Sequence, residues 1–151
     1  MNIRIDNLQG PEIRQLLQKQ LHGMTLHSPS ESVHALDLEA WRRPEVKFWT
    51  AWEAMDLLGC GALKELERRP GEIKSMRTSL SHLRKGVARS VLDHMIVEAR
   101  RRGYGRLSLE TGSMQAFAPT RELYLSRDFS YCDPFAQYVP DPYSVFMTKM
   151  L

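Results

Sequence analysis

The segment from Glu72 to Thr111 decides the fold. It reads EIKSMRT over 72–78, HLRKGVA over 82–88 and LSLET over 107–111, with a long amphipathic stretch between the last two pieces. The first and last pieces have the character of strands, whereas the piece at 82–88 is a turn of small and basic residues. This order predicts a β-turn-α-β unit, around which the rest of the chain is arranged.

The stretch after this turn has the pattern of a single amphipathic helix. Its apolar side chains recur at the i, i+4, i+5 spacing of one helical face. Arg100, Arg101 and Arg102 suit the negative end of the helix dipole, and Gly103 tolerates the left-handed conformation that ends many helices. The apolar face consists of Val87, Ala88, Val91, Leu92, Met95, Ile96 and Ala99.

The turn before this helix is a candidate anion site. The first N–H groups of a helix have no internal partner, and the dipole makes that end positive. Gly86 and Ala88 allow a phosphate to approach the main chain, and Arg84, Lys85 and Arg89 add positive charge. From spacing alone, a basic surface turn that caps an ordinary helix explains the pattern equally well, because one glycine is a weak signal.

These residues resemble motif A of the GNAT superfamily of acetyl-CoA-dependent N-acetyltransferases. In that family the motif reads Gln/Arg-x-x-Gly-x-Gly/Ala and binds the pyrophosphate of coenzyme A. Gly86 and Ala88 match the last two fixed positions, whereas Leu83 departs from the first. The resemblance implies acetyl-CoA as co-substrate, bound by Met76, Arg77, Thr78, Leu83, Arg84, Lys85, Gly86, Val87, Ala88, Arg89 and Tyr124.

The resemblance covers nearly the whole chain in the family's order. Residues 121–129 (RELYLSRDF) resemble the motif Leu-Tyr-x-x-x-Gly-Phe, with Asp128 in place of the glycine. Phe117 stands where an asparagine is common, and residues 144–150 (SVFMTKM) look like the closing strand of small bacterial members.

Length and composition indicate one globular domain over residues 1–151, with 42% hydrophobic and 26% charged residues. The longest apolar runs are too short to span a bilayer, and the first residues lack the apolar core of a signal peptide. We therefore expect a cytoplasmic protein with no membrane partner. Cys60 and Cys132 have no zinc-like spacing and are expected to be reduced thiols.

The net charge of +3 is modest and is concentrated near residues 84–89 and 100–102. A phosphorylated cofactor needs such local charge, whereas a nucleic-acid binder usually spreads it along a face with interleaved aromatic residues. We predict no nucleic-acid partner. The five histidines show no pair at metal-ligand spacing with a third ligand, and we predict no metal.

The other periodic segments predict an α+β fold with helices on both faces of the sheet. The resemblance identifies it as a GNAT-like fold with a mixed, mostly antiparallel central sheet. Besides the central unit, strands are expected at 2–6, 46–52, 57–66, about 129–131 and 145–151, and helices at about 11–21, 35–41 and 117–127. A proline-punctuated crossing joins the last two strands.

Acetyl transfer to an amine needs a base, support for the oxyanion and a proton for the departing thiolate. By resemblance, Tyr124 lies near the cofactor sulfur, where a phenol with an ordinary pKa near ~10 can protonate the thiolate. The alternative is a core aromatic residue beside Leu123. The resemblance also implies that the main chain of Met76 and Thr78 bonds the pantetheine arm and that the N–H of Met76 polarises the acetyl carbonyl.

Glu72 matches the position of the general base in the histone-acetylating branch of the family. A carboxylate there accepts the amine proton if burial raises its basicity. It could instead be a strand-edge acid paired with Lys74 or Arg77. Glu110 is a secondary candidate for the base or for binding the substrate ammonium.

The resemblance also places residues around Thr25, His27 and Ser28 beside the acceptor groove. For any single one of these polar side chains, hydrogen bonds to nearby loop backbone are the favoured explanation. Two further alternatives concern the surface: Trp49, Trp52 and Phe146 form either the interface of the homodimer that the resemblance suggests or part of the core.

The favoured hypothesis is an enzyme that transfers acetyl directly from acetyl-CoA to a primary amine of a small molecule or amino acid. Cys132 as an acyl carrier has no activating base nearby in the sequence. The alternatives are a non-catalytic acyl-CoA-binding or sensing domain, motivated by Leu83, Phe117 and Asp128, and a protein N-acetyltransferase.

Overall fold

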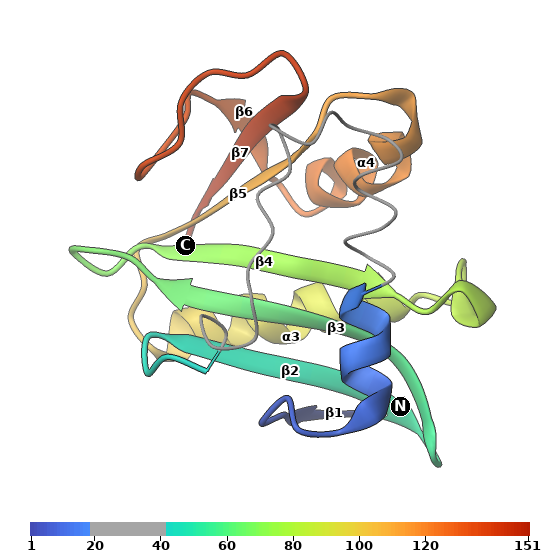
Figure 1. The fold of residues 1–151 in the computed structure, drawn as a ribbon. Helices are drawn as coiled ribbons and strands as arrows, with labels where there is room; N and C mark the ends of the chain where they lie inside the picture. Colours follow the sequence, from blue (N-terminus) through green and yellow to red (C-terminus); the bar gives the residue numbers. More distant parts are fainter. Residues whose placement is uncertain (19–41) are drawn as a thin grey trace.

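The computed structural model describes residues 1–18 and 42–151, and its strands form one seven-stranded sheet (Figure 1). The strand order is β1-β2-β3-β4-β5-β7-β6. All neighbouring strands are antiparallel except β4 and β5, which are parallel. The bounds are β1 Asn2–Ile5, β2 Val46–Glu53, β3 Asp56–Glu65, β4 Gly71–Thr78, β5 Arg106–Gly112, β6 Ser130–Cys132 and β7 Ser144–Met150.

Helix α3 (Val87–Arg101) follows the predicted face closely. The residues that it buries are Val87, Val91, Leu92, Met95, Ile96 and Ala99. Gly103, at φ 80°, ends it: its N–H bonds to Arg100 O, and the N–H of Tyr104 bonds to Ala99 O, both at 3.0 Å. These two bonds form a Schellman motif, in which the left-handed residue satisfies the last helical carbonyls.

The remaining helical segments are short. Helix α4 spans Ala118–Ser126, and the 3-10 turns η2 and η3 span Leu80–His82 and Gln115–Phe117. Phe117 therefore ends a 3-10 turn instead of beginning the helix. An N-terminal helix begins at Pro11, where proline needs no N–H partner, and is described as far as residue 18. Within the described ranges, no helix is long and apolar enough to cross a bilayer.

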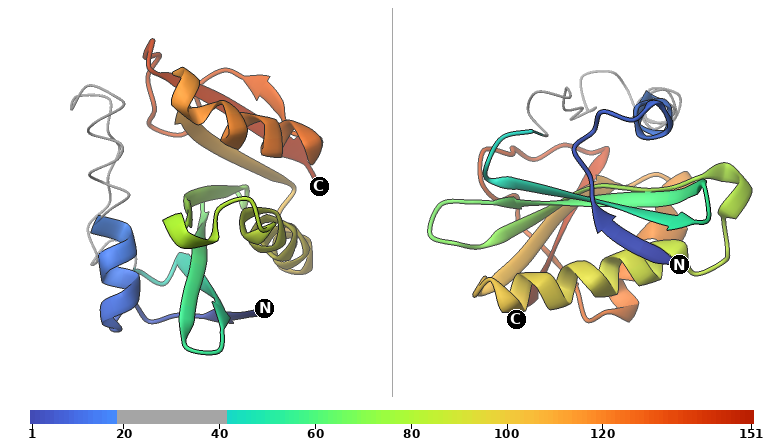
Figure 2. Two further views of the ribbon diagram at one scale, coloured as in Figure 1. Left: turned by 90° about the vertical axis from the view of Figure 1, so that its right-hand side faces the viewer. Right: turned by 90° about the horizontal axis from the view of Figure 1, so that it is seen from below.

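Helices cover both faces of the sheet, as predicted (Figure 2). On one face, α3 and α4 pack on a core that includes Trp49, Leu63 and Leu109. On the other, the N-terminal helix contributes Ile13 and Leu16 to a second cluster with residues of β2 and β3. The two clusters are separate because successive strand side chains point to opposite faces. The fold is α+β with a mixed, mostly antiparallel sheet.

Some predictions about the surface are settled here and others are not. Trp49 and Phe146 are buried core residues, so they cannot be the dimer surface that was considered for them. The Trp52 ring is half-buried and lies under the Arg4 guanidinium, 4.6 Å from its centroid. Thr25, His27, Ser28 and the expected helix at 35–41 lie outside the described residues.

Candidate active site

The two parallel strands separate in the middle of the sheet. Pairing between β4 and β5 runs only from Gly71 with Leu107 to Ile73 with Leu109, after which the strands diverge (Figure 1). Beyond Ile73, β4 remains paired with β3 but no longer with β5. This edge of β4 can accept an extended ligand by main-chain hydrogen bonds, in the manner of an added strand.

A β-bulge lies on β4 just beyond this point. The β3–β4 ladder pairs Ala62 with Lys74 and then Cys60 with Arg77, so that Ser75 and Met76 lie opposite Gly61 alone. Ser75 has φ 53°, and its carbonyl oxygen accepts a hydrogen bond from Cys60 Sγ at 3.2 Å.

Gly61 leaves room opposite the bulge for the Met76 side chain, whose Sδ would lie 2.8 Å from a Cβ at this position. Bulges leave main-chain groups outside the regular ladder. The predicted carbonyl-polarising N–H, that of Met76, belongs to this bulge.

The N-terminus of α3 is open. Gly86, the N-cap residue, has φ 81°, and nothing lies within 4 Å of the position where its Cβ would be. The first helical bond is from the Ser90 N–H to Gly86 O at 3.0 Å, so the N–H groups of Val87, Ala88 and Arg89 precede the intrahelical ladder. An uncapped helix start with this free space suits a phosphate group.

Positive side chains surround this helix start. Arg84, Lys85 and Arg89 are all exposed, and Lys85 Nζ lies 3.5 Å from His82 Nδ1. Leu83, the departure from motif A, is also exposed and offers no polar group. The structure therefore groups the predicted phosphate-binding positions of this turn around one surface, as motif A requires.

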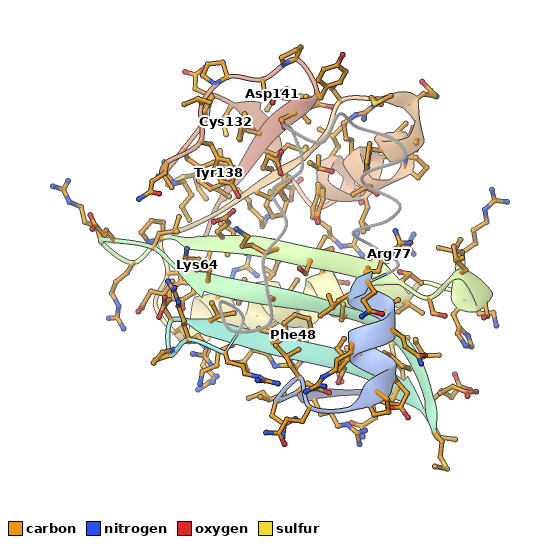
Figure 3. The ribbon with its side chains drawn as sticks, viewed as in Figure 1. Phe48, Lys64, Arg77, Cys132, Tyr138 and Asp141 are labelled. Carbon is orange, nitrogen blue, oxygen red and sulfur yellow. The ribbon has the colours of Figure 1, made fainter. Side chains whose placement is uncertain are left out.

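Arg77 is placed differently from the other candidate positions. It pairs across strands with Cys60, which belongs to the cluster under the N-terminal helix, so its side chain lies on the face opposite α3. Figure 3 shows Arg77 near the carboxyl end of β4, where the strand approaches η2. Arg77 therefore resembles Met76 and Thr78 only in the main chain that it offers along β4. Its guanidinium group lies on the sheet face opposite α3.

Tyr124 is a buried residue of α4 with 3% of its surface exposed. Its ring packs edge-on against Phe129, with ring centroids 5.4 Å apart, in the core that also contains Val87 and Leu109. Burial raises the pKa of Tyr124 above its ordinary value, in contrast to the ordinary pKa expected from the sequence. The phenol stays protonated at neutral pH, as a proton donor must, but it is a weaker acid than we expected.

The structure explains two departures from the family pattern. Asp128 has φ 69°, so it occupies the left-handed conformation for which the family keeps glycine, at some conformational cost. Phe117 packs its ring on Gly112, where a Cβ would come within 3 Å of three ring atoms. Arg121 Nη1 supports this corner by donating to Gly112 O at 2.8 Å.

Glu72 lies on β4 where the strands begin to diverge, with 3% of its surface exposed. The Tyr138 hydroxyl donates to Glu72 Oε2 at 2.6 Å, and Lys74 Nζ lies 3.5 Å from the same oxygen. Lys74 Nζ also donates to the Tyr138 hydroxyl at 3.3 Å. Of the two ion pairs considered for Glu72, the pair with Lys74 is present, and Arg77 lies farther along the strand.

Sequence reasoning missed Tyr138. It comes from the irregular crossing between β6 and β7, 66 residues from Glu72, and no periodicity there marks it. Its ring contacts Phe135 and Phe146, with centroids 5.1 and 5.5 Å away. Glu110, the secondary candidate, lies nearby on β5 and accepts a 2.5 Å hydrogen bond from the Ser144 hydroxyl.

Neither cysteine has the features of an acyl carrier. Cys60 is buried, and burial raises the pKa of its thiol to about 12. Burial also raises the pKa of Cys132. Since the thiolate is the nucleophile, both shifts lower reactivity. Among residues 1–18 and 42–151, no group of His, Cys, Asp and Glu side chains could hold a metal ion.

A sheet that opens between parallel β4 and β5, beside an uncapped helix start, fits an acyl-CoA-dependent acyltransferase. The chain belongs to the acetyltransferase (GNAT) family, whose model matches residues 11–129. It is 64% identical, over all 151 residues and the full length of the relative, to the uncharacterized N-acetyltransferase YsnE of Bacillus subtilis (strain 168).

Solved structures have the same fold. A crystal structure described as an acyl-CoA N-acyltransferase from Klebsiella pneumoniae gives a TM-score of 0.80 at 25% identity, covering 99% of this chain and 97% of that one. A Bacillus subtilis acetyltransferase in complex with CoA gives 0.73 at 18% identity, covering 99% and 98%. The residues at the α3 start and along β4 fit a CoA-type co-substrate.

Proposed function

We propose that this enzyme transfers an acetyl group from acetyl-CoA directly to a primary amine of a small molecule or amino acid. The observation that carries the proposal is the position of one buried carboxylate. Glu72 lies near the beginning of β4, where this strand diverges from β5, and its side chain is on the sheet face opposite α3. The N-terminus of α3 follows the carboxyl end of β4. A base and an anion site are thus available to two different substrates.

Coenzyme binding is assigned to main-chain groups. The N–H groups of Val87, Ala88 and Arg89 hold the pyrophosphate, with Arg84 and Lys85 adding charge. The edge of β4 from residue 74 to 78, which β5 does not pair with, bonds the pantetheine arm.

The chemistry uses a thioester, which supplies an activated acetyl group. The amine nitrogen attacks the carbonyl carbon, a C–N bond forms, and an electron pair moves to the oxygen, which the Met76 N–H stabilises. The nitrogen gives its proton to Glu72, directly or through water.

The electron pair then returns, the C–S bond breaks, and the thiolate takes the Tyr124 proton. Solvent carries the Glu72 proton back to the Tyr124 phenolate, so that charge and protons balance. No covalent enzyme intermediate is formed.

Two carboxylates favour a cationic acceptor. Glu72 and Glu110 lie on neighbouring strands, and both interact with Tyr138. An ammonium group approaching this face meets negative charge, which favours its binding in the charged form. A protein N-terminus has the same chemistry, so a protein acceptor is the second candidate.

Thermal unfolding with and without acetyl-CoA is the first test. A ligand bound only to the native state at 100 times its Kd stabilises by about 2.7 kcal/mol, which is roughly 5–10 °C for a chain of this size. Coenzyme A should produce a similar rise. The absence of any rise with saturating acetyl-CoA would contradict the proposal.

An amine panel then separates the acceptor classes. Small amines and amino acids are compared with peptides that have free N-termini, and both thiol release and the acetylated product are measured. Turnover of small amines supports the proposal, turnover of peptides alone indicates a protein acetyltransferase, and coenzyme binding without any turnover favours an acyl-CoA sensor.

A further inference from the structure

The contact between Tyr138 and Glu72 joins two distant parts of the chain. Glu72 belongs to β4, whereas Tyr138 belongs to the connection between β6 and β7. Their hydrogen bond, at 2.6 Å, lies where the sheet opens between β4 and β5. Figure 3 shows Tyr138 between that connection and β4.

The Tyr138 ring is held firmly. It packs against Phe135 and Phe146, which also contact each other with ring centroids 5.9 Å apart. The Tyr138 N–H bonds to Phe135 O at 3.0 Å, and Lys74 Nζ lies 5.8 Å from the centre of the Tyr138 ring. Because packing fixes the ring, the hydroxyl is directed at Glu72 without further ordering.

Two described partners of Glu72, on residues 74 and 138, act on the same carboxylate oxygen. Both the Tyr138 hydroxyl and Lys74 Nζ approach Oε2. Neither of these two contacts uses Oε1. A tyrosine hydroxyl has one proton, and Tyr138 donates it to Glu72. The lone pairs of the Tyr138 oxygen therefore accept the 3.3 Å hydrogen bond from Lys74 Nζ.

The charged surroundings keep Tyr138 a donor. Burial raises the pKa of Tyr138, and the Glu72 and Glu110 carboxylates raise it further. The other described charges facing Glu72 are Lys74 on its own strand and Lys64, its cross-strand neighbour on β3. A neutral phenol that cannot easily ionise is a stable hydrogen-bond donor to a carboxylate.

We propose that Tyr138 is a positioning residue: its hydroxyl, with the Lys74 ammonium, fixes Oε2 of Glu72 so that Oε1 is presented to the amine. This inference rests on the proposed function, because it assigns Tyr138 to the base of that reaction. Tyr138 does not touch the reacting atoms, and it acts through the orientation and the ionised state of Glu72.

The test uses the Tyr138→Phe variant, which keeps the ring packing and removes only the hydroxyl. The Glu72 carboxyl is followed by NMR in protein labelled with ¹³C at glutamate Cδ, and its signal is assigned by loss in Glu72→Gln. We expect the Glu72 Cδ signal in Tyr138→Phe to move from its wild-type chemical shift at neutral pH, because Oε2 loses a hydrogen-bond donor. Tyr131→Phe, on exposed β6, should leave it unchanged.

Kinetics with an amine identified in the panel test the second consequence. Tyr138→Phe should lower kcat/KM by roughly tenfold or more. Coenzyme A affinity should stay constant, and the Glu72→Gln/Tyr138→Phe double variant should be no slower than Glu72→Gln alone. An unchanged Glu72 signal in Tyr138→Phe, or full additivity of the two substitutions, would overturn the inference.

Failure of the proposed function gives a different result. If Glu72→Gln keeps wild-type kcat/KM and pH profile, the base assignment fails and the positioning role of Tyr138 fails with it. If Glu72→Gln is impaired but Tyr138→Phe is unaffected, only the inference about Tyr138 is refuted.

Discussion

Replacing Gly59 with alanine should test the packing that holds the site together. Gly59 lies on β3, opposite Thr78, and a Cβ there would be 2.6 Å from Arg77 O and 2.8 Å from Val87 Cγ1. The carbonyl oxygen is a main-chain atom that no rotamer change can move. The substitution therefore pushes β3 away from β4 and from the first residue of α3.

Two opposing effects set the magnitude. Overpacking of this kind costs about 1–3 kcal/mol, and the contact here is with backbone, which favours the upper part of that range. Replacing glycine also lowers the conformational entropy of the unfolded chain, which raises the free energy of unfolding by about 0.4–1 kcal/mol. We expect a net loss of about 2 kcal/mol in the free energy of unfolding, and with a urea m value of about 2 kcal/mol/M the midpoint falls by about 1 M.

Gly105→Ala is the matched control. Nothing lies within 4 Å of the Cβ position at Gly105, and its φ is not in the left-handed range. Its urea midpoint should equal or slightly exceed that of the wild type. Gly59→Ala should also lose part of the coenzyme A-induced rise in Tm, because β4 and the α3 start are displaced together. A Gly59→Ala midpoint equal to that of Gly105→Ala would refute this reasoning.

Three other predictions concern charge, proton donation and pH. Alanine at both Arg84 and Lys85 should weaken coenzyme A binding by roughly tenfold, and added salt should reduce the difference, as calorimetry at two ionic strengths will show. Tyr124→Phe should lower kcat by about 10²-fold with little change in coenzyme A affinity; an unchanged kcat would remove the assigned acid. Because burial raises the pKa of Cys60 from 9.0 to about 12, the unfolded thiol ionises first, so stability is lost as pH rises from 9 towards 12. The slope is at most about 1.4 kcal/mol per pH unit for one group. Cys60→Ala should flatten it in urea titrations, whereas Cys132→Ala should flatten it less, because Cys132 is only half-buried.

Local patterns predicted most of the fold. The strands at 46–52 and 72–78 are present to within one residue at each end, and the buried residues of α3 are those of the predicted apolar face, apart from half-buried Ala88. Gly86 and Gly103 mark both ends of α3 with positive φ. These features are predictable because hydrophobic periodicity and left-handed turn residues act over a few residues of chain.

The candidate site was only partly predictable. The sequence determined the basic turn at 82–89, the carboxylate of Glu72 and the position of Tyr124 on its helix. The tertiary structure decided the divergence of β4 from β5, the bulge at Ser75 and the bond from Tyr138 to Glu72. These depend on contacts between segments far apart in the chain, where strand pairing and packing select one arrangement that no local pattern encodes.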